Sequence, residues 1–159
     1  MATYLKLGMC IALFQLAIGS EAKAKNIAFD IGFTTNCVKF SDDYEQCVGK
    51  SAGACSDATV FGGTLDGMAR CVVEELKYWD ARMNALAAKN KEILADESQH
   101  ALDTFTAMQD SWVIFRNADC AFEASLMDQA DAAISIPLCK MKMTAQQVQH
   151  LEMILGDEK

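Results

Sequence analysis

Apolar residues recur at helical spacing over a long stretch of this 159-residue chain. Between residues 65 and 93 they follow one another at gaps of three and four, with one gap of seven, so they form one stripe of a helix. The stripe consists of Leu65, Met68, Val72, Leu76, Trp79, Met83, Leu86 and Ile93. It predicts a helix of about thirty residues that begins after Thr64 as N-cap and ends near Ala95. Strand signals are almost absent, so we expect an all-α fold.

A second long helix is predicted from about Glu97 to Leu126. Asp96 is its expected N-cap, and Gln99 three positions later completes a capping box. The inward stripe of this helix mixes apolar and polar residues: Leu102, Phe105, Gln109, Trp112, Arg116 and Asp119, with Met108, Phe115 and Phe122 beside it. A tight turn near Asp96 would make the two long helices an antiparallel pair.

The antiparallel pairing predicts which residues of the two helices face one another. From helical rise alone, facing residues have numbers that sum to about 193 to 196. This brings together a polar cluster of Asp80, Asn84, Gln109 and Arg116, held between Trp79 and Trp112. Because a guanidinium and a carboxylate form a strong bidentate pair, we interpret the cluster as a structural clamp that fixes the register of the helices. The alternative is a general-acid or ligand site.

Two shorter helices are expected to flank the long pair. Ser41, followed by three carboxylates at 42, 43 and 45, is typical of a capped helix start. Thr144 with Gln147 forms another capping box, which would open a final helix with Val148, Leu151, Ile154 and Leu155 facing inward. Pro137 is expected in the connection between Asp128 and Met141, because proline disrupts helix interiors. Together these elements predict one small helical bundle built on the long antiparallel pair.

The first two dozen residues have the features of a secretory signal peptide. Lys6 precedes the thirteen-residue apolar run LGMCIALFQLAIG, and small residues allow cleavage after Ala22 or Ala24. A membrane anchor needs about twenty apolar residues, and this run is shorter and contains Gln15. Cys10 lacks the preceding small residues of a lipid-anchor site. We therefore expect residues 1–24 to be a signal peptide, residues 25–159 a single domain, and the mature protein to be periplasmic or secreted.

Removing the signal peptide would leave six cysteines, an even number in an exported chain. They are Cys37, Cys47, Cys55, Cys71, Cys120 and Cys139. Three disulfides are the expected result, and the sequence leaves all 15 pairings open. No Cys-x-x-Cys occurs, which argues against a thioredoxin-like redox centre and against a compact zinc site.

The chain is acidic, with 14 basic and 22 acidic residues and a formal net charge of -8. This charge disfavours nucleic acid and anionic lipid as partners. It suits a basic protein as partner, and it is also what solubility alone would require.

The sequence gives little support to three kinds of chemical site. His100 and His150 are far apart and lack a serine or thiolate partner for nucleophilic catalysis. Cys139, Met141 and Met143 offer soft sulfur ligands for Cu(I), but a disulfide would occupy the cysteine. No pair of carboxylates stands out as the acid and base of a glycosidase. We therefore assign no catalytic, cofactor-binding or metal-binding residue and expect a protein that is not an enzyme.

The segments WDARMN, from Trp79, and QDSWVIFRNADC, from Gln109, resemble the LprI-like lysozyme-inhibitor family of small exported bacterial helical domains. The residues that fit the family pattern, within a resemblance from about Cys37 to Leu155, are Cys55, Cys71, Asp80, Asn84, Gln109, Trp112, Arg116, Cys120 and Cys139. The resemblance implies disulfides Cys55–Cys71 and Cys120–Cys139, which leaves Cys37 with Cys47. The chain departs from the family pattern in the segment MDQADAAIS and in the glutamines at 146 and 147, where an arginine is usual.

Two classes of function follow from these observations. The first is inhibition of a basic lysozyme, which the resemblance implies and the acidity permits. Its candidate contacts are Asp128 and Asp131, in the loop that Cys120 and Cys139 would close, together with Asp42 and Asp43. The second is a non-enzymatic envelope interaction or structural module without lysozyme activity. The sequence does not indicate an oligomeric state.

Overall fold

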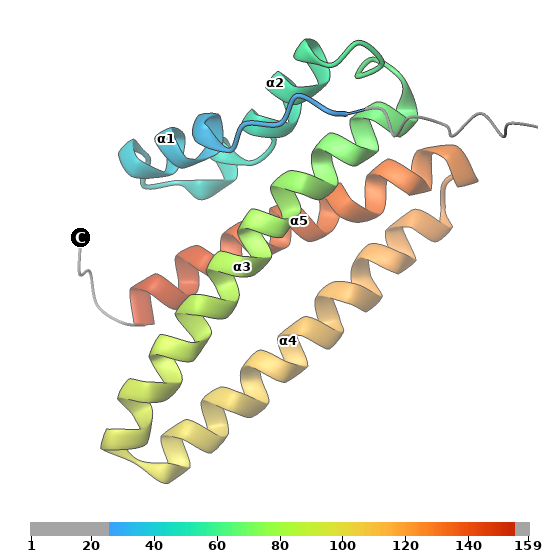
Figure 1. Ribbon diagram of the computed structural model, residues 1–159. Helices are drawn as coiled ribbons and strands as arrows, with labels where there is room; N and C mark the ends of the chain where they lie inside the picture. The colour runs from blue at the N-terminus through green and yellow to red at the C-terminus, as the bar shows by residue number, and fades with distance from the viewer. Residues whose placement is uncertain (1–25, 155–159) are drawn as a thin grey trace, which may run out of the picture.

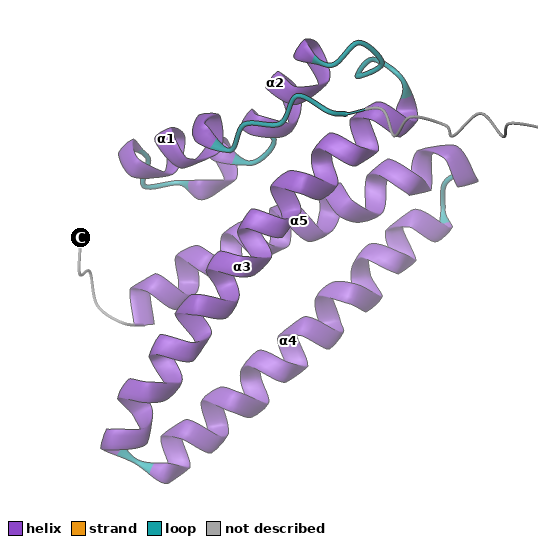
Figure 2. Cartoon of the chain, viewed as in Figure 1, coloured by secondary structure: helices purple, strands orange, loops and turns teal. Residues whose placement is uncertain are grey.

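The computed structural model describes residues 26–154, and all regular structure within this range is helical. The elements are α1 (Gly32–Phe40), the short 3₁₀ helix η1 (Tyr44–Cys47), α2 (Lys50–Ala58), α3 (Leu65–Glu97), α4 (Gln99–Ser125) and α5 (Gln129–Ile154). Figure 2 shows helices joined by short loops. The predicted all-α class is confirmed. The expected signal peptide, with Cys10, and the expected inward residue Leu155 lie outside the described residues.

The helices α3 and α4 form the long antiparallel hairpin that the sequence predicts (Figure 1). Thr64 is the N-cap of α3, and its hydroxyl accepts a 3.1 Å hydrogen bond from the backbone N–H of Gly67. The predicted capping box of Asp96 and Gln99 is wrong, because Asp96 still belongs to the last turn of α3. Ser98 is the single residue between the helices and caps α4 by accepting from the N–H of Ala101.

The last helix is much longer than predicted. The side chain of Asp128 accepts from the backbone N–H groups of Ala130 and Asp131 and so starts α5 at its first turn. Pro137 is therefore a buried residue inside α5, not part of a connection. Thr144 is not an N-cap either, because its hydroxyl donates to the Lys140 carbonyl one turn earlier in the same helix. The predicted start of the final helix was wrong by about four turns.

The three long helices make the body of the fold, and the N-terminal elements cover one end of it. The most extensive helix packing is between α3 and α5, with α4 contacting both. Helix α2 packs on α3, η1 contacts α5, and α1 contacts both α2 and η1 (Figure 1). The bundle is thus built on three long helices, whereas the sequence predicted a long pair with short additions.

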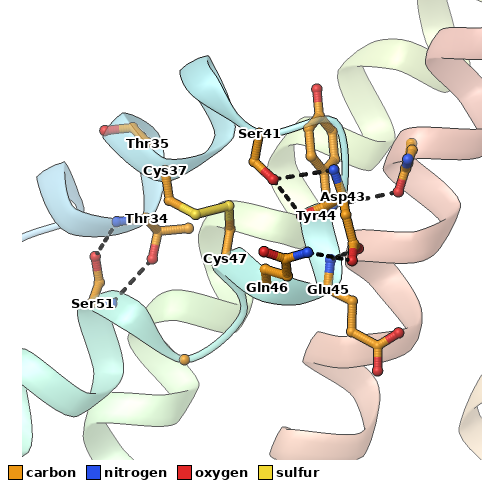
Figure 3. Close-up of a disulfide and its surroundings, with 12 residues drawn as sticks. Thr34, Thr35, Cys37, Ser41, Asp43, Tyr44, Glu45, Gln46, Cys47 and Ser51 are labelled. Atoms are coloured by element: carbon orange, nitrogen blue, oxygen red, sulfur yellow. Dashed lines mark hydrogen bonds between the residues drawn. A yellow bond between two sulfur atoms is a disulfide. The ribbon is translucent and has the colours of Figure 1, made fainter.

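The N-terminal elements are held together by a disulfide and by reciprocal hydrogen bonds (Figure 3). Thr34 and Ser51 each donate a backbone N–H to the other's hydroxyl, at 3.0 and 3.1 Å. Ser41 does not cap a helix start as predicted; it is the C-cap of α1. The cap of η1 is Asp43, which accepts from the N–H of Glu45 at 2.9 Å.

Three disulfides join the elements, in the pairs that the family resemblance implies: Cys37–Cys47, Cys55–Cys71 and Cys120–Cys139. Both ends of the predicted apolar stripe of α3 are wrong, since Leu65 and Ile93 are exposed. The other predicted residues of that stripe are buried or half-buried, and all of them except Met68 belong to or pack against one core. That core also holds Met141, Ala145, Val148 and Leu151 of α5. Between residues 26 and 154 no helix combines the length and apolarity needed to span a bilayer.

Candidate functional site

The predicted contact between the long helices occurs at Arg116 and Asp80. One guanidinium nitrogen, Nη1 of Arg116, lies 2.5 Å from Asp80 Oδ1 and 2.6 Å from the Thr144 hydroxyl oxygen. The guanidinium also lies over the Trp112 ring, 5.3 Å from its centroid. The pair is not the bidentate one that we expected, because the same nitrogen serves residues of both α3 and α5. Arg116 therefore joins three helices.

A second polar contact lies beside the first. The amide nitrogen of Gln147 donates to the amide oxygen of Gln109 at 2.8 Å, and both side chains are buried. We call the five residues Asp80, Gln109, Arg116, Thr144 and Gln147 the polar seam. Asn84 was expected in this cluster, but it is exposed and makes no hydrogen bond to the seam. The buried asparagine of α3 is Asn90, which donates to the carbonyls of Leu86 and Leu151.

The polar seam has the properties of a scaffold. Arg116 is almost completely buried, its carboxylate partner is about a third exposed, and each contact bridges different helices. Trp79 does not flank the cluster as predicted; it packs near Tyr44 and Tyr78. We interpret the seam as a structural clamp between α3, α4 and α5.

A buried carboxylate that the sequence analysis missed lies at the start of α2. Glu75 is fully buried, and its two carboxylate oxygens each accept a 2.8 Å hydrogen bond from a backbone N–H, of Gly49 and Ala52. The indole N–H of Trp79 donates to the same group at 3.2 Å. Gly49 is the N-cap of α2, so the carboxylate satisfies free N–H groups where the helix dipole favours negative charge. Glu75 lies on the inward stripe between Val72 and Trp79, and this position could have indicated from the sequence that the carboxylate is buried.

Another missed cluster joins the two ends of the described chain. The Tyr44 hydroxyl donates to a Glu152 carboxylate oxygen at 2.5 Å, and Arg82 lies 2.6 Å from the other oxygen of the same group. Burial and the hydrogen bond to Glu152 raise the pKa of Tyr44 from 10.0 to about 12. The cluster ties η1 and α3 to the end of α5.

The four carboxylates predicted to contact a partner are all exposed, but they lie in two separate places. Asp42 and Asp43 precede η1, where Asp43 is engaged as a cap. Asp128 and Asp131 are not in a long loop, because only residues 126–128 separate α4 from α5. Asp128 is occupied as the cap of α5, while Asp131 lies in its first turn.

An apolar groove with acidic residues on its walls lies beside the Cys120–Cys139 disulfide. It has a volume of about 480 Å³ and runs between α4, the first half of α5 and the residue after η1. We call it the acidic groove; it is lined by Val48, Glu123, Asp131, Ile134, Ser135, Leu138, Cys139 and Lys142. Of the predicted contacts, only Asp131 lines it. The groove was missed because the segment between Asp128 and Met141 was expected to be a connection, whereas it is the first half of α5.

A metal ion is not a good fit to this groove. One carboxylate oxygen of Asp119, one of Glu123 and the sulfur of Cys139 lie within 4.8 Å of one another. The sulfur is bonded to Cys120 and is therefore not a thiolate ligand. Two exposed or half-exposed carboxylates remain, which is less than a protein metal site normally provides.

The fold and the sites define a class of protein: a small all-α domain with three disulfides. Its buried polar side chains mostly form hydrogen bonds between helices. The chain belongs to the LprI lysozyme-inhibitor family, since the family model described as "Lysozyme inhibitor LprI" matches residues 55–151. The match spans the end of α2 through α5 and includes two of the disulfides. Comparisons with curated proteins and with solved structures found no match.

Proposed function

We propose that this protein is an exported inhibitor that binds a basic lysozyme through acidic surface and blocks cleavage of the cell wall. The family match over residues 55–151 carries the proposal. The formal net charge of -8 supports it, because an acidic protein and a strongly basic one associate quickly. The inhibitor itself performs no chemistry in this scheme.

The scaffold suits an inhibitor that must not rearrange when it binds. Two disulfides and the polar seam connect α2, α3, α4 and α5, and the third disulfide ties α1 to η1. A rigid surface loses little conformational entropy on association, which favours affinity. The carboxylates outside the seam are mostly exposed and are therefore free of the desolvation that a buried charge would carry.

Export is part of the same proposal. Residues 1–24 serve as the signal peptide, with cleavage after Ala22 or Ala24, and residues 25–159 form one mature domain. A periplasmic or secreted location would place the disulfides in an oxidising compartment. It would also place the inhibitor where lysozyme reaches the cell wall.

The test is a cell-wall lysis assay with the oxidised mature protein titrated into a c-type and a g-type lysozyme. We expect inhibition of at least one of them, stronger at about 20 mM than at about 150 mM salt because screening weakens charge attraction. Absence of inhibition of both enzymes at a high micromolar excess would contradict the proposal.

The second candidate function is a non-enzymatic envelope interaction module. One observation favours it: α4 exposes Ile114, Phe115 and Phe122, and Leu126 follows at its end. Exposed apolar residues on one helix are typical of a protein-binding surface. A chain that binds neither lysozyme but recovers a partner from the envelope through this surface would favour the module.

A further inference from the structure

The acidic groove has a mostly apolar lining that includes two carboxylates, Glu123 and Asp131, and one cation, Lys142. Val48, Ile134 and Leu138 give it apolar walls, and the Cys120–Cys139 disulfide closes one side. Glu123 and Asp131 reach it from two helices. A groove of this kind suits a long side chain with an aliphatic stem and a cationic head.

The only cation in the lining is already paired. Lys142 lies 2.6 Å from Glu45, a contact that raises the pKa of Lys142 and lowers the pKa of Glu45, and the charge of Glu123 also raises the pKa of Lys142 without a salt bridge between the two. Within residues 26–154, no lysine, arginine or histidine forms a salt bridge with Glu123 or Asp131. The same holds for Asp119, whose carboxylate lies within 4.8 Å of that of Glu123. These like charges repel one another, and an external cation would relieve the repulsion.

We propose that the acidic groove receives a lysine or arginine side chain from a cationic protein partner. The aliphatic stem lies against Ile134 and Leu138, and the head group is held by Glu123 and Asp131, with Asp119 adding to the negative potential. The assignment rests on the proposed function, in which the partner is a basic lysozyme, and it names the surface that makes the contact.

Some exposed carboxylates lie far from the groove, so its contribution to binding can be measured separately from the attraction due to net charge. Helix α4 is about 40 Å long by its rise, so its far end lies well beyond the Debye length of about 8 Å at physiological salt. Glu92 and Asp96 are exposed carboxylates in the last turns of α3, which lead into that far end of α4, and they share the net charge but do not line the groove. They provide a matched control.

The experiment compares the double variant Glu123→Gln/Asp131→Asn with the control Glu92→Gln/Asp96→Asn, which removes the same charge. Binding of the oxidised protein is measured by calorimetry at about 150 mM salt against two probes: a c-type lysozyme and a hexa-arginine peptide. Circular dichroism establishes that both variants are folded. We expect the groove variant to bind each probe about tenfold or more weakly and the control to stay within about twofold of wild type.

A third variant tests the apolar wall. Leu138 is partly exposed, so Leu138→Asn changes the groove with little effect on the core. We expect weaker binding of both probes with an unchanged dependence on salt, because no charge is lost.

The outcomes separate the groove from the proposed function. If the groove variant and the control weaken lysozyme binding equally, the groove is not the contact surface. The proposed binding of lysozyme would be unaffected by that result. Peptide binding that depends on the groove, without any lysozyme binding, would support the groove and contradict the function. Failure of the wild-type protein to bind either probe would overturn both.

Discussion

The indole N–H of Trp79 donates a 3.2 Å hydrogen bond to the carboxylate of Glu75, one helical turn earlier in α3, and both side chains are completely buried. The two carboxylate oxygens also accept hydrogen bonds from two backbone N–H groups at the start of α2. A charged side chain in the core thus positions α2 on α3, next to the Cys55–Cys71 disulfide.

Glu75→Gln should destabilise the protein by about 2 to 3 kcal/mol, because each carboxylate oxygen accepts a backbone N–H. In glutamine one of these oxygens becomes an NH2 group, which would face a backbone N–H so that two donors oppose each other. Urea unfolding measures the change, with Glu74→Gln as control. Glu74 forms a surface pair with Lys77, so its substitution should cost less than about 0.5 kcal/mol. Equal effects of the two substitutions would contradict this role of Glu75.

The polar seam predicts unequal effects for its two charged members. Arg116→Ala removes the bonds to Asp80 and Thr144 and the contact with Trp112, and should cost about 2 to 3 kcal/mol. Asp80→Asn should cost about 1 kcal/mol, because Asp80 is about a third exposed and water can replace its partner. Chemical denaturation followed by tryptophan fluorescence gives both values. A larger loss for Asp80→Asn would show that the carboxylate, not the guanidinium, anchors the seam.

The Tyr44 hydroxyl predicts a loss of stability in alkaline solution. Burial and the hydrogen bond to Glu152 raise its pKa from the ordinary 10.0 of an unfolded chain to about 12 in the folded protein. A group whose folded pKa is raised stabilises the fold fully below pH 10 and loses that contribution as the pH rises to about 12. Urea midpoints across this range should fall for wild type and fall less steeply for Tyr44→Phe. Parallel curves would show that Tyr44 does not contribute.

Two adjacent glycines before α3 should respond differently to alanine. A Cβ on Gly62 would lie only 1.9 Å from the carbonyl oxygen of Ser56, whereas a Cβ on Gly63 would meet nothing within 4 Å. Gly62→Ala should therefore cost about 2 kcal/mol or more, since backbone must move. Gly63→Ala should change stability by less than about 0.5 kcal/mol. Thermal unfolding separates the two, and similar melting temperatures would contradict the close packing of this turn.

The sequence predicted the features that depend on long periodic patterns. The extent of α3, the antiparallel pairing of α3 with α4, and the contact of Arg116 with Asp80 follow from helical spacing and rise. The residue numbers of Arg116 and Asp80 sum to 196, within the range of about 193 to 196 expected from helical rise.

The errors arose where tertiary contacts outweigh local signals. Pro137 was predicted to lie in a connection, but Asp128 starts α5 upstream of it and the Cys120–Cys139 disulfide links this part of α5 to α4. Thr144 was predicted to be an N-cap because its side chain is suited to that role. Instead, its hydroxyl accepts a hydrogen bond from Arg116 in the middle of α5. Glu75 was overlooked, since only the fold brings the start of α2 to it.

We interpret the polar seam as scaffold and propose that the acidic groove contacts the partner. Hydrogen–deuterium exchange of the complex with a c-type lysozyme tests this most directly. We expect protection in peptides covering residues 119–142 and unchanged exchange at the turn between α3 and α4. Protection confined to that turn, or no protection along the groove in a complex that has formed, would contradict the account.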